Sequence, residues 1–407
     1  MRRREMLALA AAGAAAPLVA PVWAARAEAR PQRLVVVMLR GAVDGLNVVV
    51  PYAESAYYAA RPTIAIAKPG AENGALALDE SFALHPALAA LMPLWAEKKL
   101  AFIHAAGSPD PTRSHFDAQQ FIENGTPGRG TTPDGWLNRT LAALPGARSP
   151  TEALAIGPTL PFILKGSAAA ANLALGPKAA QPTALDQPEI ASAFDRLYAG
   201  NDRQSAAFRE GRQARSQLVA DLSAEERAAD NGAPPAASLP TTAEQLGRLM
   251  VQDARIRLVF ASLGGWDTHV AQGNHAGQLA GHLKPLGDGL AALAHALGPV
   301  WNDTVVVVLS EFGRTVHENG NRGTDHGHGN VIWVLGGPVN GGKVYGAWPG
   351  LAAAQLYQNR DLAVTTDYRH ALAAILERHL RLNDAALAKI FPAMPAPEGD
   401  LARLLSA

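Results

Sequence analysis

Cysteine is the residue that this sequence lacks altogether, with none among its 407 residues. Its absence excludes disulfide bonds, zinc sites built from thiolates and catalysis by a thiol nucleophile. A metal ion in this protein must therefore be bound by histidine, carboxylate, hydroxyl or carbonyl groups.

An excess of charge of either sign is also missing, because 36 lysines and arginines balance 36 aspartates and glutamates. The basic surplus that indicates a nucleic-acid partner is not there, so we expect none. Beyond the N-terminus, no stretch reaches the roughly 18 uninterrupted apolar residues of a membrane span, so we expect no transmembrane segment in the mature chain. Hydrophobic residues make up 48% of the sequence, enough for a sizeable core.

The first 29 residues, MRRREMLALAAAGAAAPLVAPVWAARAEA, have the layout of an export signal: a basic start, an apolar stretch and small residues at the end. Residues 3–7, RREML, resemble the twin-arginine motif that a translocase reads. The alternative is an ordinary signal with chance arginines, but the weakly hydrophobic stretch suits the twin-arginine route better. We therefore expect a signal peptide over 1–29, the twin-arginine translocase as a partner during export, and a periplasmic or secreted domain over 30–407.

Five short runs rich in β-branched residues predict buried strands. They are continuously apolar, which is typical of strands covered on both faces of a parallel sheet. Amphipathic helical stretches lie between them, so the sequence predicts an α/β layered fold. Residues 145–250 have few β-branched residues and are predicted to form a mostly helical insertion. The predicted strands are 33–39, 100–105, 256–262, 304–310 and 330–337, and the helices 86–98, 114–124, 276–297 and 366–380.

Polar and charged residues follow four of the predicted strands. In open α/β sheets, sites form outside the carboxyl ends of the strands, so we expect these side chains to converge. Carboxylates together with imidazoles suit a divalent metal such as Zn, Mn, Fe or Mg. Singly, an Asp-x-His or a DHGHG segment could be only a turn or a solvated loop, so the prediction depends on the combination. The residues are Asp44, Ser114, His115, Asp267, His269, Glu311, Arg314, Asp325, His326 and His328.

Ser114 has two compatible interpretations. It precedes Asp117 by three residues at a predicted helix start, which matches a capping box. The same helix end favours a nearby anion, so Ser114 could also be a nucleophile that attacks a bound phosphate. Arg113 and Arg314 are candidates for clamping the oxygens of such an anion, or for structural ion pairs, and His115 is a candidate acid or base.

Taken together, five segments resemble the bacterial exported proteins of domain-of-unknown-function family 1501, within the alkaline phosphatase-like (sulfatase-like) superfamily. The resemblance implies an alkaline-phosphatase-like three-layer sandwich with a mainly parallel central sheet and the helical insertion. The segments are MLRGAVDGLNVVVPY, RSHFDAQQFIENG, GGWDTH, SEFGRT and GTDHGHGN…VLGGPVNGGKVYG.

The resemblance also implies roles for single residues. Asp44 matches the aspartate of the first strand that bridges metals, and Ser114 matches the nucleophile. Asp267 and His269 match one metal's ligands, though more closely spaced than usual, and His326 or His328 matches a late metal-binding histidine. Glu311 stands where an Asp-His pair is usual, and Phe312 replaces that histidine.

Two functions are compatible with these residues. The first is an exported metal-dependent hydrolase or transferase that acts on a phosphoester or related small anionic substrate. The alternative, which Phe312 favours, is a non-enzymatic exported metal- or glycan-binding protein on the same fold. A sulfatase is not expected, because Pro109 occupies the nucleophile position of PDPTR and cannot become a formylglycine.

Overall fold

The computed structural model describes residues 31–146, 149–157, 160–173, 188–200, 202, 204–206, 208–209, 239–396 and 401–406. The predicted signal peptide and parts of the predicted insertion lie outside these residues. Within the described part of the chain, no helix combines the length and apolar character needed to cross a membrane.

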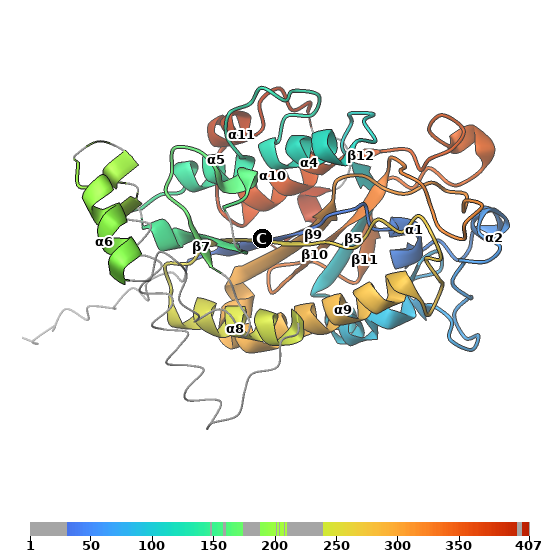
Figure 1. The fold of residues 1–407 in the computed structure, drawn as a ribbon. Coiled ribbons are helices and arrows are strands. Elements are labelled where there is room, and N and C mark those ends of the chain that lie inside the picture. Colours follow the sequence, from blue (N-terminus) through green and yellow to red (C-terminus); the bar gives the residue numbers. More distant parts are fainter. Residues whose placement is uncertain are drawn as a thin grey trace, which may run out of the picture. The chain divides into compact units, whose positions relative to one another are not determined.

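A nine-stranded mixed sheet forms the centre of the fold (Figure 1). Its order is β11–β5–β10–β9–β1–β8–β6–β7, and the short β12 also pairs with β5. All pairings are parallel except those of β10, which runs antiparallel to both β5 and β9. The strands are β1 (Arg33–Leu39), β5 (Leu100–Gly107), β6 (Ala153–Ile156), β7 (Ala171–Leu173), β8 (Leu258–Leu263), β9 (Thr304–Ser310), β10 (Asn330–Gly336), β11 (Lys343–Tyr345) and β12 (Thr366–Asp367).

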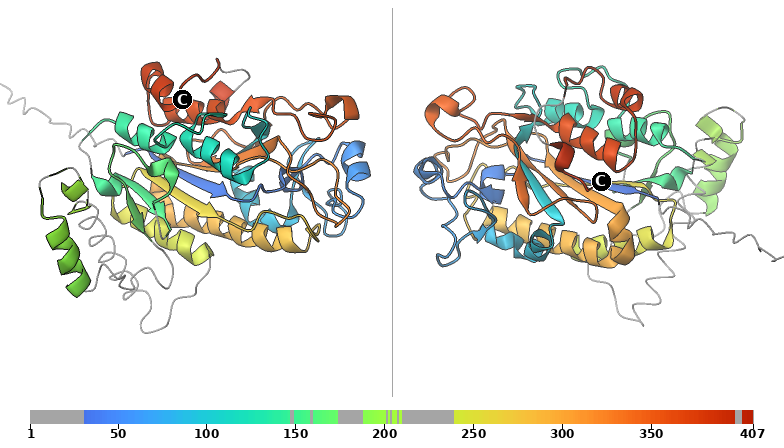
Figure 2. Two further views of the ribbon diagram at one scale, coloured as in Figure 1. Left: turned by 45° about the horizontal axis from the view of Figure 1, so that its top comes forward. Right: turned by 180° about the vertical axis from the view of Figure 1, so that it is seen from behind.

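Helices cover both faces of this sheet, so the predicted three-layer α/β architecture is confirmed (Figures 1 and 2). On one face lie α4 (His115–Asn124), α5 (Trp136–Ala143), α10 (Tyr368–Arg378) and α11 (Asp384–Ile390). On the other lie η1 (Pro86–Leu91), α3 (Met92–Ala96), α8 (Leu239–Gln252) and α9 (Gln278–Leu297). The remaining elements are α1 (Gly45–Val48), α2 (Ser55–Ala60), α6 (Pro188–Leu197), η2 (Pro150–Glu152), η3 (Phe162–Leu164), η5 (Gly298–Asp303), η6 (Ala353–Gln355), η7 (Leu401–Arg403) and a small sheet of β2 (Val49–Val50), β4 (Ala83–Leu84) and β3 (Leu76–Ala77).

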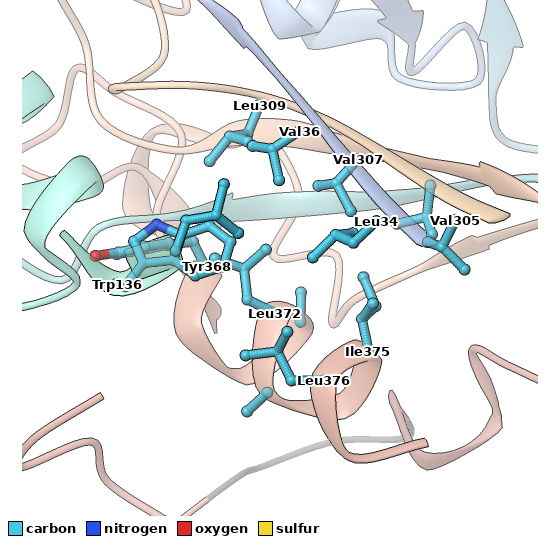
Figure 3. Packing of buried hydrophobic residues seen from close by; sticks show 14 of the residues in the cluster. Leu34, Val36, Trp136, Val305, Val307, Leu309, Tyr368, Leu372, Ile375 and Leu376 are labelled. Atoms are coloured by element: carbon cyan, nitrogen blue, oxygen red, sulfur yellow. The ribbon is translucent and has the colours of Figure 1, made fainter. Parts of the chain in front are cut away.

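The two-sided burial of β1 explains why its sequence is apolar from Leu34 to Leu39. Leu34 and Val36 belong to the core beneath α10, where they pack with Leu372 and neighbouring side chains (Figure 3). Val35 and Val37 belong to the core beneath α9. Successive side chains of a strand point to opposite faces, so a strand between two helical layers needs apolar residues at every position.

Two sequence predictions about strands differ from the structure. Residues 330–337 are expected from the sequence to lie in a parallel sheet, but β10 is antiparallel to both neighbours. The direction could not be predicted, because an apolar run indicates burial and not strand direction. The predicted insertion over 145–250 also contains β6 and β7, which extend the central sheet beyond β8. Their sequences, ALAI and ANL, are short and almost free of β-branched residues, so they carried no strand signal.

The reversal of β10 decides what lies at the functional edge of the sheet. The carboxyl ends of β1, β5, β8 and β9 share one edge, because these four strands run in the same direction. The amino end of β10 lies at that edge too. The connection over residues 311–329 therefore starts and finishes beside the ends of the other strands.

Candidate metal centre

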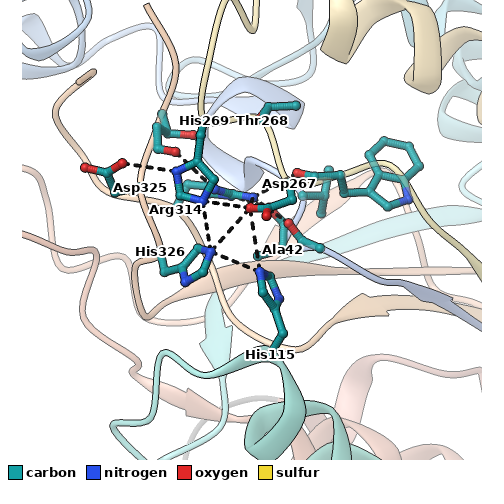
Figure 4. A network of polar contacts seen from close by, with 12 residues as sticks. Ala42, His115, Asp267, Thr268, His269, Arg314, Asp325 and His326 are labelled. Atoms are coloured by element: carbon teal, nitrogen blue, oxygen red, sulfur yellow. Dashed lines mark hydrogen bonds and ion pairs between the residues drawn. The ribbon is translucent and has the colours of Figure 1, made fainter. Parts of the chain in front are cut away.

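Three imidazoles and one carboxylate meet at this edge (Figure 4). The Nε2 atom of His326 lies 2.9 Å from Nε2 of His115 and 3.0 Å from Nε2 of His269. Oδ1 of Asp267 lies 2.9 Å from Nε2 of His269, 3.3 Å from that of His326 and 3.6 Å from that of His115. Atoms bound tetrahedrally to one ion at about 2.0–2.1 Å are roughly 3.3 Å apart, so these four atoms have the spacing of metal ligands.

The hydrogen bonds at Nδ1 fix how the three rings are protonated. Nδ1 lies 2.8 Å from Oε1 of Glu311 in His115 and 3.1 Å from Oδ1 of Asp325 in His269. In His326 it lies 2.9 Å from the carbonyl oxygen of Arg113. Ionised carboxylates and carbonyls only accept, so each Nδ1 carries a proton, and whenever a ring is neutral its lone pair is at Nε2.

Three lone pairs and a carboxylate oxygen thus face one another at about hydrogen-bond distance. Only a cation or a proton between them makes this arrangement favourable. A histidine that binds a metal through one nitrogen and donates from the other to a carboxylate or carbonyl is the usual pattern in metal sites. His115, Asp267 and His326 are close enough together to hold one ion, and Nε2 of His269 lies beside two of these ligand atoms, 3.0 Å from His326 and 2.9 Å from Asp267.

The partner of His115 is firmly held. Glu311 is buried, and its Oε1 also accepts from the backbone N–H of Gly41 at 2.8 Å and from Nε2 of Gln119 at 3.0 Å. Burial alone would raise the pKa of Glu311, but these hydrogen bonds and that of His115 outweigh it and lower the pKa. The hydrogen bond to Glu311 in turn raises the pKa of His115. Glu311 therefore stays ionised and orients the ring.

Asp325 and Asp267 are also kept as carboxylates. Asn319 donates to Oδ1 of Asp325 at 3.0 Å, and this bond, with that of His269, lowers its pKa. Partial burial opposes ionisation of Asp267, but a hydrogen bond and the charge of Arg314 outweigh it, so its pKa is also lowered. Burial lowers the pKa of His326, which favours the neutral ring that a metal needs.

The sequence allowed Arg314 to be an anion clamp or a member of a structural ion pair. In the structure its buried side chain is paired with Asp267, and the anion-clamp role stays a prediction. Its side chain is fully covered, and it donates to the carbonyls of Gly41, Ala42, Trp266 and Thr324 as well as to Asp267. All three guanidinium nitrogens are engaged with the protein. The residue joins the turn after β1, the loop after β8 and the loop before β10.

Close backbone contacts explain the glycines of this region. A Cβ on Gly313 would lie 1.8 Å from the carbonyl oxygen of Gly329, and one on Gly323 would lie 2.3 Å from the carbonyl carbon of His269. Real Cβ atoms do not approach other atoms so closely, so both positions require glycine. The glycine-rich segment lets the loop fold against the chain that carries the ligands.

Asp44 has a partner other than a metal ion. It is fully buried, and Arg61 binds both of its oxygens at 2.6 and 3.0 Å. Gln272 donates to the same carboxylate at 2.7 Å. The metal role predicted for Asp44 stays a prediction, and this buried ion pair occupies the oxygens that a metal would need. Arg61, which belongs to none of the sequence motifs, gave no signal of this.

Gln272, Thr268 and Thr324 form a hydrogen-bonded frame behind the ligands. Nε2 of Gln272 must face the acceptor Asp44, so its Oε1 accepts from the hydroxyls of Thr268, at 2.7 Å, and Thr324, at 2.9 Å. Thr268 stands between Asp267 and His269, and Thr324 precedes Asp325. All three side chains of the frame are fully buried. One amide group therefore connects the two loops that supply most of the cluster.

The other predicted site residues lie around the cluster. Ser114 is exposed and caps α4 with a long contact of 3.5 Å from the Asp117 amide. Arg113 donates to Asp361 at 2.5 and 3.1 Å, while its carbonyl holds His326. His328 is buried and stacks on Tyr357, with ring centroids 4.4 Å apart. The catalytic and metal roles of these residues stay predictions.

His115 is the cluster member that sequence reasoning did not assign as a ligand. It was considered only as an acid or base, because the capping pattern drew attention to the neighbouring Ser114. The available signal was its position as the first residue of a helix that follows β5, at the same edge as the other ligands.

The cluster is open to solvent. The side chain of Asp267 is 45% exposed and that of His269 is 38% exposed, while those of His115 and His326 are about a quarter exposed. The opposite side of the cluster is closed by Glu311 and Arg314. A bound ion would therefore have one accessible side.

Comparisons with solved structures find distant similarities. The zinc complex of the C-terminal periplasmic domain of EcEptC from Escherichia coli is 11% identical, with a TM-score of 0.36 over 76% of this chain and 73% of that one. The lipoteichoic acid synthase LtaP from Listeria monocytogenes is 10% identical, with a TM-score of 0.32 over 77% and 69%. Alkaline phosphatase from the Antarctic bacterium TAB5 is 10% identical, with a TM-score of 0.31 over 75% and 91%.

No curated protein matches the sequence significantly. A family model described as "Protein of unknown function (DUF1501)" matches residues 31–391. The match includes every strand of the central sheet and every residue of the cluster. The chain therefore belongs to the DUF1501 family.

Proposed function

We propose that the protein is a divalent-metal-dependent hydrolase or transferase that acts on a phosphoester or related anionic substrate. The observation that carries this proposal is the convergence of three imidazole nitrogens and the Asp267 oxygen at a solvent-open point. When bound, a metal ion at this point would supply positive charge that polarises an anionic oxygen of the substrate.

The donor set narrows the choice among Zn, Mn, Fe and Mg. Magnesium prefers an octahedron of oxygen ligands and keeps several of its waters. Three imidazoles and one carboxylate suit the transition metals better, and zinc binds both donor types at the observed spacing. We therefore expect zinc, iron or manganese in preference to magnesium.

The exposure of the ligands supports a reactive site over a purely structural one. Structural zinc sites are closed by four protein ligands, whereas catalytic sites keep a position for water or substrate. Here His115, Asp267 and His326 can supply three protein ligands, and the partly exposed side chain of Asp267 leaves room for a further ligand. A small anion could approach from that side without displacing a buried group.

Ser114 is the candidate nucleophile. It directly precedes His115, is exposed, and stands at the N-terminus of the ten-residue helix α4. The unpaired N–H groups of a helix N-terminus favour negative charge, so a phosphoryl group near Ser114 would be stabilised there.

A second candidate function is metal or glycan binding without catalysis. Within the described residues, no second group of three histidine or acidic side chains converges closely enough to hold another ion. Arg61 pairs with Asp44, and the ring of the buried Phe312 packs at a tilt against His115 and His326, at the position of an expected ligand. These features favour a single-metal site and are compatible with a protein that only binds.

Metal analysis followed by turnover measurements would test the proposal. We expect the protein purified from the export compartment to contain about one transition-metal ion per chain and to hydrolyse phosphomonoesters or phosphodiesters. Ser114→Ala should fold and keep the metal but lose turnover, and Ser114→Asp should restore the helix cap without restoring turnover. Full turnover of Ser114→Ala would exclude Ser114 as the nucleophile, and a metal-loaded parent without turnover would favour the binding function.

We also propose that the mature domain works in the periplasm or outside the cell, delivered by the twin-arginine translocase. The RREML segment and the weakly hydrophobic stretch after it support this route. The route carries proteins that are already folded, often with a cofactor in place, which suits a domain whose cluster is completed only by folding.

A further inference from the structure

Two arginines hold His326 from outside the cluster. Nδ1 of its ring donates to the carbonyl oxygen of Arg113 at 2.9 Å. The carbonyl oxygen of His326 itself accepts from Nη2 of Arg360, also at 2.9 Å. The first bond orients the imidazole, and the second fixes the backbone from which the imidazole projects.

Asp361 lies between the guanidinium groups of these two arginines. Its Oδ2 accepts from Nε and Nη2 of Arg113 at 3.1 and 2.5 Å, and its Oδ1 lies 3.8 Å from Nε of Arg360. The carboxylate is fully covered, whereas the side chains of Arg113 and Arg360 are 27% and 41% exposed. One buried carboxylate is therefore the common partner of the two groups that hold His326.

The backbone brings Asp361 to the same place. Asp361 forms an isolated antiparallel bridge with Thr315, and the preceding residue, Arg314, forms another with His326. The chain at Asp361 and the chain at His326 thus pair with neighbouring residues of one segment. This pairing fixes the position of the carboxylate relative to His326.

One oxygen of Asp361 has an unusual environment. Oδ1 is buried and has no hydrogen-bond partner among the described residues. A buried polar atom of this kind lowers stability, so its presence needs an explanation. A neutral side chain would avoid the cost but could not attract both guanidinium groups. These contacts favour a role for the charge of Asp361 at His326 over a role in stability.

We propose that Asp361 is a positioning residue of the candidate metal centre and keeps His326 in place through Arg113 and Arg360. This inference rests on the proposed function, because it takes His326 as a metal ligand. Through Arg113, Asp361 steadies the carbonyl that holds the proton on Nδ1 and so leaves Nε2 for the metal. Through Arg360, it steadies the backbone of the ligand residue. Loss of such an outer partner reduces metal affinity about 10–100-fold in other metal sites.

Zinc titration of the metal-free protein by calorimetry would test the proposal. Asp361→Asn keeps the size of the side chain and removes its charge, so we expect zinc to bind about tenfold more weakly. Arg113→Met keeps the backbone carbonyl that holds His326 but removes the guanidinium, and should cause a similar loss. It also provides the measurement if Asp361→Asn does not fold. The double variant should be little worse than either single variant, because both substitutions break the same contact.

Cobalt(II) bound in place of zinc provides a readout that a change in stability alone would not alter. The visible absorption of bound cobalt depends on the number and kind of its ligands, so it should change when His326 is displaced in Asp361→Asn. Asp253→Asn is the matched control. Asp253 is another buried carboxylate paired with an arginine, Arg255, but it lies before the amino end of β8, at the opposite edge of the sheet. This variant should lose stability and keep both the zinc affinity and the cobalt spectrum of the parent.

The outcomes separate this inference from the proposed function. A parent that binds zinc, together with an Asp361→Asn variant of unchanged zinc affinity and cobalt spectrum, would overturn this inference alone. Full additivity of Asp361→Asn and Arg113→Met would also overturn it. A parent protein that binds neither metal would overturn the proposed function together with it.

Discussion

His326 and Asp44 illustrate two ways in which a polar side chain is held at the edge of one sheet. The lone pair of His326 at Nε2 faces two more lone pairs and a carboxylate oxygen. The charge of Asp44 is matched by the buried guanidinium of Arg61. The first arrangement is unfavourable until a cation arrives, whereas the second is complete within the protein.

Substitution of these two residues should therefore change different properties: zinc affinity for His326 and the stability of the metal-free protein for Asp44. His326→Ala should reduce zinc affinity by more than the roughly 10–100-fold that loss of an outer partner costs, while leaving the metal-free protein as stable as the parent. Asp44→Asn should destabilise the metal-free protein by about 3–5 kcal/mol, because Arg61 keeps an uncompensated buried charge. Urea unfolding with a chelator and zinc titration would measure both. Equal destabilisation by the two variants would contradict this view of the cluster.

At the scale of elements, the loop after β8 and the loop before β10 are held together by side chains as well as by backbone. Thr324 donates its N–H to the carbonyl of Thr268 at 3.1 Å, and both hydroxyls meet on Gln272. Metal ligands on loops need such support, since a ligand that wanders loses affinity.

Gln272→Met should weaken zinc binding about 10–100-fold, because methionine matches the size of glutamine but makes none of its hydrogen bonds. Thr268→Val tests the mechanism in a double-mutant cycle. The two substitutions should be clearly less than additive in zinc affinity, since each breaks the same hydrogen bond. The buried Ile375→Val in α10 should lower stability modestly and leave zinc affinity unchanged. Full additivity of the pair would exclude Gln272 from a positioning role.

The sequence allowed the strong elements and most of the cluster to be predicted. Continuous β-branched runs located β1, β5, β8, β9 and β10, and the residues after them were expected at one edge. Strand direction, the weak strands β6 and β7, and the pairing of Asp44 with Arg61 depend on contacts between distant segments. The choice of His115 as a ligand likewise depends on which way a helix faces, and no local pattern encodes that.

At the scale of the whole molecule, two buried histidines should make the fold sensitive to acid. His104 accepts from the backbone N–H of Ala105 and contacts the carbonyl of Val49, and His85 is held in the same way by Ala87 and Asn274. Each ring is therefore neutral, and burial lowers both pKa values from 6.5 to about 4.

The unfolded chain binds these two protons near pH 6.5 and the folded protein only near pH 4, so stability should fall as the pH is lowered across this interval. Each histidine contributes up to about 3 kcal/mol to the loss. His104→Gln should be less stable than the parent at pH 7 but lose less on going to pH 5. Urea unfolding at both pH values, with a chelator present, would measure this. Parallel losses in parent and variant would show that His104 does not contribute.

The proposed export concerns the whole chain as well. Replacing Arg3 and Arg4 by lysine should leave the precursor in the cytoplasm, because the translocase recognises the arginine pair. Fractionation of cells followed by detection of precursor and mature forms would measure this. Normal export of the lysine variant would refute the twin-arginine interpretation.

The reversed direction of β10 has a consequence for how this family can diversify. Residues 311–329 leave the sheet at the end of β9 and re-enter it at the start of β10, at the same edge. They form a loop whose length does not affect how the strands pair. Lengthening such a loop costs little, about 0.6 kcal/mol for each doubling of a flexible loop. Its exposed tip at residues 320–322 can therefore grow or shrink, while Asn319 and Gly323 on either side keep their contacts with Asp325 and His269. Relatives with different substrates should differ in length there, while the strands on either side keep their register.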